Sequence, residues 1–183
     1  LQLSVCSFTV FTAAFAIYNV YAYAGLMAIH YGKTEDSNSA GYYAGWIASG
    51  FMLGRFFTAF AWGAIADTHG RKVVLISGCA GMTIFATVFG LASTFEGAIG
   101  ARFGMGFFNG VVGTGKTVVS ELVPAERKDL QAFAMSILMT AVSFGGIIGP
   151  AVGGWLADPC GSGSSLCIPI LERYPFLLPN LLN

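Results

Sequence analysis

The 183-residue chain is strongly apolar, with 55% hydrophobic and only 10% charged residues. An ordinary soluble domain carries about 25% charged residues, so this composition excludes a typical water-soluble domain and favours a lipid environment. Nine basic and nine acidic residues cancel, so no footprint of nucleic-acid binding is present. The 25 glycines also fit membrane helices, because glycine lets such helices approach closely.

Five segments have the length of a membrane helix, which needs roughly 20 largely apolar residues. They run over Ser4–Ile29, Tyr42–Ala64, Val73–Phe95, Ile99–Val123 and Leu130–Leu156. A sixth segment opens near Tyr174 and Pro175. Because the chain begins without methionine and stops inside an apolar run, we expect residues 1–183 to be a piece of a longer protein.

The connections between these segments predict the orientation. The second-to-third and fourth-to-fifth connections hold four cations: Arg71, Lys72, Arg127 and Lys128. The connections on the other side hold two, Lys33 and Arg173. The positive-inside rule therefore places the first group, and the N-terminus, in the cytoplasm. The pattern leaves open whether the membrane is the plasma membrane or that of the vacuole.

The connection after the second segment contains five residues with distinct physical roles: Gly63, Asp67, Gly70, Arg71 and Lys72. Gly63 permits close packing and Gly70 permits a tight turn. Asp67 can accept from the N–H groups at the start of a helix, and Arg71 can pair with an acid. The spacing fits a charged latch that holds one conformation, and it fits a solvated loop with topogenic charge equally well.

The fifth segment carries small residues at helical spacing. Gly145, Gly149 and Gly153 recur every four residues and so share one helix face, beside a second stripe of Gly146, Pro150 and Gly154. Such a smooth face allows intimate helix packing, and Pro150 removes a backbone donor and invites a kink. General membrane packing is the alternative explanation for the glycines.

Three cations fall within the predicted segments. Arg102 lies near the start of the fourth segment, where an arginine is costly and indicates a function unless it snorkels to the surface. Arg55 and Lys116 lie deeper in the second and fourth segments, so we expect both to face a central cavity. Neither has an evident acidic partner at that depth.

Other patterns predict less. Residues 110–117 fit the phosphate-binding pattern Gly-x4-Gly-Lys-Thr, but they lie inside an apolar stretch with no preceding strand, so we do not predict nucleotide binding. No spacing typical of a catalytic triad or a zinc site recurs, so neither an enzyme, a metal site nor a cofactor is predicted. Cys160 and Cys167 fit a disulfide and two free thiols equally well.

Several of these patterns resemble signatures of the major facilitator superfamily. Residues 63–72 match its loop Gly-x-x-x-Asp-x-x-Gly-Arg-Lys/Arg, which implies that Asp67 and Arg71 stabilise the outward-open state with an acid at the end of the fourth helix, here Glu121. Arg102 resembles the arginine that this family links to proton coupling. The antiporter signature is matched by residues of the fifth segment: Ser136, Gly145, Gly149, Pro150, Gly153 and Gly154.

Nearly the whole chain resembles the zinc-induced facilitator-like branch of drug:proton antiporters, in Gly54-Arg55, in residues 62–72, in Asn109-Gly110 and in residues 174–179. This resemblance implies an all-α fold, with residues 1–183 as the N-terminal six-helix bundle of a twelve-helix transporter. It implies alternating access, a small-molecule or ion substrate exchanged with protons, and as partners the lipid bilayer and the C-terminal half of the same chain. A facilitative carrier and a non-transporting scaffold or sensor are the alternatives.

Overall fold

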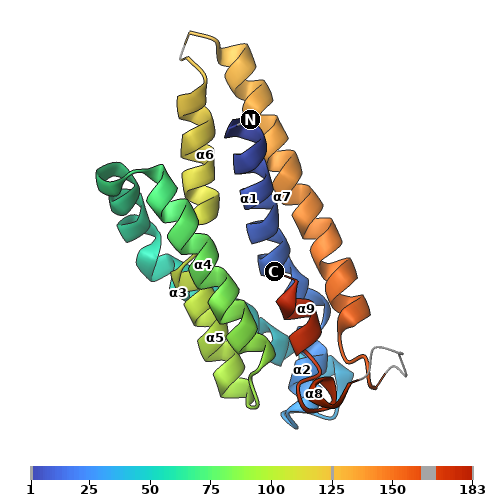
Figure 1. The fold of residues 1–183 in the computed structure, drawn as a ribbon. Helices are drawn as coiled ribbons and strands as arrows, with labels where there is room; N and C mark the ends of the chain where they lie inside the picture. Colours follow the sequence, from blue (N-terminus) through green and yellow to red (C-terminus); the bar gives the residue numbers. More distant parts are fainter. Residues whose placement is uncertain (1, 125, 162–167, 183) are drawn as a thin grey trace.

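The computed structural model describes residues 2–124, 126–161 and 168–182, and within these ranges every regular element is a helix (Figure 1). This agrees with the all-α prediction. A membrane segment must satisfy its backbone hydrogen bonds internally, and a helix does so within one stretch of chain.

The first predicted segment is not one helix. It divides into α1 (Gln2–Asn19), the short 3-10 helix η1 (Val20–Ala22) and α2 (Ala24–His30). At the break, the amide of Tyr23 donates to the carbonyl of Val20 over 3.1 Å. The Tyr23 side chain is fully buried there, so packing of this ring accompanies a bend that the apolar pattern did not predict.

The second and third segments form α3 (Ser37–His69) and α4 (Arg71–Gly90). Helix α3 extends past the predicted range at both ends. Helix α4 ends before the predicted boundary because the next helix already starts at Phe95, where the Thr94 hydroxyl accepts from the amide of Gly97 over 3.1 Å.

The fourth segment is interrupted near its middle. Three residues, 108–110, separate helix α5 (Phe95–Phe107) from helix α6 (Val111–Leu122). Two side chains of α3 satisfy the last carbonyl of α5: Thr58 donates to the Phe107 oxygen over 2.9 Å and the Trp62 indole over 2.7 Å. Sequence analysis predicted one continuous helix, because the break occurs inside an apolar run.

The fifth segment forms α7 (Lys128–Leu156), which agrees with its predicted range. Two short helices follow, α8 (Pro169–Arg173) and α9 (Leu177–Leu181), where the sixth segment was expected to open. Helix α7 packs along α1, α3 packs along α5, and α9 contacts α4 and α7 (Figure 1).

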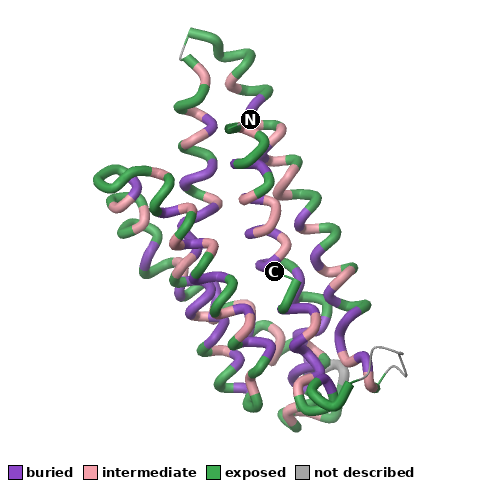
Figure 2. The backbone as a smooth tube through the Cα atoms, in the orientation of Figure 1, coloured by how far each residue is buried: buried purple, intermediate pink, exposed green. Residues whose placement is uncertain are grey.

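Buried residues lie along the lines where helices meet (Figure 2), and many large apolar side chains remain exposed. Phe60 is 89% exposed and Trp155 78% exposed, which is expected where lipid replaces water around the protein. Within the described residues, three stretches are long and apolar enough to cross a membrane by themselves: Gln2–Ala22, Arg71–Gly90 and Lys128–Leu156. The break after α5 leaves the fourth segment as two helices of 13 and 12 residues, each shorter than the bilayer requires.

Candidate functional site

A single residue, Gly70, joins α3 to α4. It has a φ of +90°, a conformation that side-chain-bearing residues rarely adopt, and so glycine is required here. The turn places Asp67, near the end of α3, one helical turn before Arg71, the first residue of α4. This local geometry follows directly from the Gly-Arg-Lys sequence.

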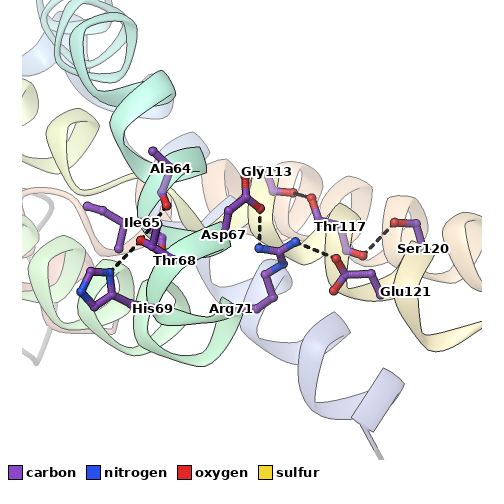
Figure 3. A network of polar contacts seen from close by, with 10 residues as sticks. All are labelled: Ala64, Ile65, Asp67, Thr68, His69, Arg71, Gly113, Thr117, Ser120 and Glu121. Atoms are coloured by element: carbon purple, nitrogen blue, oxygen red, sulfur yellow. Dashed lines mark hydrogen bonds and ion pairs between the residues drawn. The ribbon is translucent and has the colours of Figure 1, made fainter.

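Arg71 pairs with two carboxylates at once (Figure 3). Its Nη1 lies 2.6 Å from Oδ1 of Asp67, and its Nη2 lies 2.7 Å from Oε1 of Glu121. The planar guanidinium offers several donors in a fixed fork, which suits this bridging geometry. The Arg71 side chain is 24% exposed, whereas Asp67 and Glu121 are 72% and 52% exposed. The ion pairs therefore join α3, α4 and α6 at one end of the bundle, hereafter the Arg71 end.

Two residues of this loop have other surroundings, among the described residues, than the sequence analysis considered. Gly63 was expected to allow close packing, but it is exposed, and a Cβ there would meet no described atom within 4 Å. Asp67 was expected to satisfy amides at a helix start, but Gly70 is the N-cap of α4 and no side chain caps it. The Asp67 carboxylate accepts from Arg71 instead. Lys72 is exposed beside this cluster.

Arg102 is completely buried, which excludes snorkelling to the surface. Its Nη2 donates to the carbonyl of Ile17 on α1 over 3.1 Å, and its Nη1 lies 3.6 Å from the sulfur of Met105. The guanidinium also lies over the rings of Phe51 and Phe89, at 5.1 and 5.7 Å from their centroids. Cation–π contacts of this kind partly replace hydration.

No described residue forms an ion pair with Arg102, and its Nε has no hydrogen-bond partner there. Burying a charge without a counter-ion is expensive. The desolvation cost of this buried cation is therefore only partly offset by its described contacts. A cation in such surroundings is expected to respond strongly when a nearby group changes its charge.

The glycines of α7 meet the backbone of α1. A Cβ at Gly145 would stand 2.8 Å from the carbonyl oxygen of Phe11, and one at Gly149 would stand 3.0 Å from that of Phe15. A Cβ at Gly153 would collide with Asn19. Since all three face the same helix, this stripe sets the close approach of α1 and α7.

The neighbouring stripe has looser surroundings. A Cβ at Gly146 would stand 3.5 Å from the Tyr18 ring, and one at Gly154 would stand 3.4 Å from the Ala22 side chain, both ordinary contacts. Pro150 lies inside α7 and is half-buried. Ser136 is exposed, and its hydroxyl donates to the carbonyl of Phe133 in its own helix.

Arg55 and Lys116 are not brought together in one cavity. Arg55 is half-buried on α3 and lines a cavity of about 320 Å³ next to the break between α5 and α6. Lys116 is exposed on α6 and does not line that cavity. It also belongs to the run that fits the phosphate-binding pattern, but residues 111–116 are already helical, so they form no loop that could wrap a phosphate.

A buried polar cluster at the start of the sixth segment was missed by the sequence analysis. The Asn180 amide donates to the Tyr23 hydroxyl over 2.8 Å, and the Asn19 amide donates to the carbonyl of Pro179 over 2.7 Å. Asparagines inside apolar runs are the signal that could have indicated such contacts. On the same side of the bundle, Cys160 is disulfide-bonded, whereas Cys167 lies outside the described residues.

Comparison with known proteins shows the family. The chain matches the model of the Major Facilitator Superfamily over residues 4–171. It is 39% identical over 174 residues to Protein ZINC INDUCED FACILITATOR-LIKE 1 of Arabidopsis thaliana, which covers 94% of this chain and 36% of that protein. It is 41% identical over 159 residues to Protein ZINC INDUCED FACILITATOR 1 of the same plant, with coverages of 87% and 32%.

A fungal relative supports the same family assignment. The Major facilitator superfamily multidrug transporter mfsB of Aspergillus fumigatus is 39% identical over 168 residues, with coverages of 91% and 28%. The chain thus spans about a third of the length of these relatives. Together with the helical fold and the matched loop around Asp67 and Arg71, these findings show that the chain belongs to the major facilitator superfamily of membrane transporters, in the branch of the zinc-induced facilitator-like and multidrug transporters.

Proposed function

We propose that this chain is the N-terminal part of a transporter that moves a small solute across a membrane by alternating access, in exchange for protons. The family and the names of its relatives support transport. Because the chain spans about a third of those relatives, the activity is proposed for the whole protein. In this proposal the Arg71 end faces the cytoplasm, as the distribution of lysines and arginines predicts.

The observation that carries the proposal is the double pairing of Arg71 with Asp67 and Glu121. An exposed ion pair contributes at most about 1 kcal/mol, so two of them can hold one arrangement of helices and still be released during a transport cycle. Permanent structural links in a membrane bundle would need stronger packing. We therefore assign these three residues, with Gly63, Gly70 and Lys72, to a latch that favours the outward-open state.

Arg102 is our candidate for proton coupling. Its buried charge has no described counter-ion, so a carboxylate elsewhere in the protein that gains or loses a proton would change the free energy of this arginine strongly. The interaction between unit charges at low dielectric is large even over several ångströms. A proton could thus bias the helices packed on Arg102, namely α1, α3 and α4, toward one conformation.

The close packing of α1 on α7 supports coupled exchange of solute and protons over an uncoupled leak between these helices. The glycine stripe at Gly145, Gly149 and Gly153 leaves little space between these helices. In this proposal the seam stays closed throughout the cycle, and Ser136, Pro150 and Gly154 belong to the same signature face.

One observation favours the facilitative alternative. All nine acidic residues lie at or near helix ends or in connections, and none lies in the middle of a predicted membrane segment. If transport is proton-coupled, no carboxylate in the middle of these segments carries the proton.

The test uses the full-length transporter in liposomes that contain a pH-sensitive dye. Succinate, glycylglycine and ethidium serve as anionic, zwitterionic and cationic probes, with a pH gradient imposed across the membrane. Antiport predicts that the exchanged probe moves protons in the opposite direction and that collapsing the gradient slows its accumulation. Probe movement that ignores the gradient would establish the facilitative carrier instead.

A further inference from the structure

The break between α5 and α6 opens onto a cavity of about 320 Å³ within the bundle. Residues of α3, of the break and of α6 form most of its wall, and the ion pair of Asp67 and Arg71 closes one end. Arg55 lies near the middle of α3, and Asn109 lies near the middle of the predicted fourth segment. The cavity is therefore near the depth at which transporters of broken-helix design bind their substrates.

Asn109 is a buried polar residue on the wall of this cavity, and no described contact satisfies its side chain. It is 5% exposed, it lines the cavity, and neither its amide nitrogen nor its oxygen has a hydrogen-bond partner among the described residues. A buried polar side chain without partners costs roughly 1–3 kcal/mol. An unpartnered carboxamide on a cavity wall indicates a ligand that supplies the missing hydrogen bonds.

Arg55 adds an uncompensated positive charge to the same wall. It is half-buried and makes no ion pair or hydrogen bond with any described residue. The other charges that line the cavity, Asp67 and Arg71, are paired with each other. Because Arg71 also pairs with Glu121, carboxylates more than balance the charge of that cluster. Arg55 is the cation on this wall that lacks a described counter-ion, and an anionic group beside it would be favourable.

The start of α6 reinforces this preference. Gly110 is its N-cap, and no side chain satisfies the first-turn amides. These amides and the helix dipole make the start of a helix a favourable place for an anion. A larger residue cannot replace Gly110, since a Cβ there would stand 2.8 Å from the Trp62 ring and 2.9 Å from Val74. Gly110 thus packs closely against Trp62 and Val74 and at the same time lines the cavity.

We propose that this cavity is an anion site, in which Arg55, Asn109 and the start of α6 bind a carboxylate of the transported solute. Arg55 supplies the charge, Asn109 donates a hydrogen bond through its amide, and the hydroxyl of Thr114, which also lines the cavity, lies on the same helix. The volume is at the low end of ligand pockets, which suits a small carboxylic acid better than a drug-sized molecule. The assignment of the carboxylate to a transported solute rests on the proposed function.

The first test is direct binding by the purified full-length transporter, measured as the rise in unfolding temperature with sodium succinate, against sodium chloride of equal ionic strength. A ligand that binds the folded state raises this temperature by an amount that grows with the logarithm of the ratio of its concentration to its dissociation constant. We expect stabilisation by succinate that weakens at least about tenfold in apparent affinity in Arg55→Gln, since a charge-assisted hydrogen bond is lost.

Two further variants make the result specific. Asn109→Ser shortens the side chain without adding bulk and should also weaken succinate binding, whereas Arg127→Gln removes an exposed cation remote from the cavity and should leave it unchanged. Equal stabilisation of the parent protein and Arg55→Gln would overturn the proposal. So would a parent protein that inorganic phosphate stabilises and succinate does not, because the site would then not be a carboxylate site.

Transport is measured in a separate experiment, so that failure of the anion site can be distinguished from failure of proton-coupled antiport. Succinate binding that depends on Arg55, together with solute movement that ignores the proton gradient, would leave the anion site standing and contradict antiport. Proton-coupled exchange of glycylglycine or ethidium, with no succinate binding in the parent protein, would support antiport and remove the anion site.

Discussion

Nη2 of Arg71 and Oε1 of Glu121 lie 2.7 Å apart, although the two residues are 50 positions apart in the sequence. The pair ties the beginning of α4 to the end of α6, and the same guanidinium holds Asp67 at the end of α3. One side chain thus connects the second, third and fourth membrane segments at one end of the bundle.

Replacement of Asp67 by Asn should slow transport without unfolding the protein. The variant keeps the size of the side chain but removes one of the two charges that hold Arg71. Because an exposed pair contributes at most about 1 kcal/mol, the unfolding temperature should barely change, whereas a two-state equilibrium can shift about fivefold. Insertion is checked by purification yield, and cycling by solute exchange in liposomes. An unchanged exchange rate would remove Asp67 from the latch.

Replacement of Gly149 by Ala should destabilise the seam between α1 and α7. A side chain there would meet the backbone of Phe15, which cannot move away without shifting α1. Overpacking of this kind costs about 1–3 kcal/mol. Thermal unfolding in detergent measures the loss, with Gly146→Ala as the matched control, because its Cβ would make only an ordinary contact with Tyr18. Equal melting of both variants would contradict the packing role of this stripe.

Replacement of Arg102 by Met should preserve the fold and abolish proton coupling. The methionine fills similar space between Phe51 and Phe89 and removes a buried charge that no described acid compensates. The free energy of unfolding should stay the same or rise by about 1–2 kcal/mol. Arg102→Lys keeps the charge but not the planar stacking. The measurement is the number of protons moved per solute in liposomes, and an unaltered ratio in Arg102→Met would exclude this residue from coupling.

The ion pair between Lys33 and Glu96, 2.6 Å apart at the opposite end of the bundle from Arg71, should weaken in acid. The hydrogen bond from Lys33 holds the pKa of the Glu96 carboxyl below its ordinary value. A carboxyl with a lowered folded-state pKa stabilises the fold at pH values above its ordinary pKa, and this contribution is lost as the pH falls through the folded-state value. The difference in unfolding temperature between the parent protein and Lys33→Gln should therefore shrink on acidification. A difference that is constant with pH would contradict the pairing.

The sequence predicted the helical class, the fifth segment and the loop around Asp67 and Arg71, because hydropathy and a one-residue glycine turn are local properties. It did not predict the breaks at Tyr23 and after Phe107. Both breaks lie in apolar runs, and they depend on distant partners, such as Trp62 and Thr58 on α3, which satisfy the freed carbonyl. Hydrogen bonds between segments leave no periodic signal in one segment.

The candidate site, like the fold, could be predicted from the sequence only in part. Charge in an apolar stretch marked Arg102 and Arg55 as unusual, but only the packing of four helices shows that Arg102 is fully buried and that Arg55 shares a cavity with Asn109. Gly63 fits its signature in sequence and yet packs against no described residue, since a motif records a residue type and not its neighbours.

The most direct test of the account is a double-mutant cycle on the exchange rate of the full-length transporter in liposomes, with Arg71→Gln, Glu121→Gln and the two combined. Residues that act as one unit give non-additive effects. The account predicts that each single variant slows exchange, by up to about fivefold for each ion pair lost. It also predicts that the double variant is no slower than Arg71→Gln, which already removes the pair with Glu121. Additive effects, or exchange at the parent rate in Arg71→Gln, would contradict the claim that this ion pair holds one state of a transport cycle.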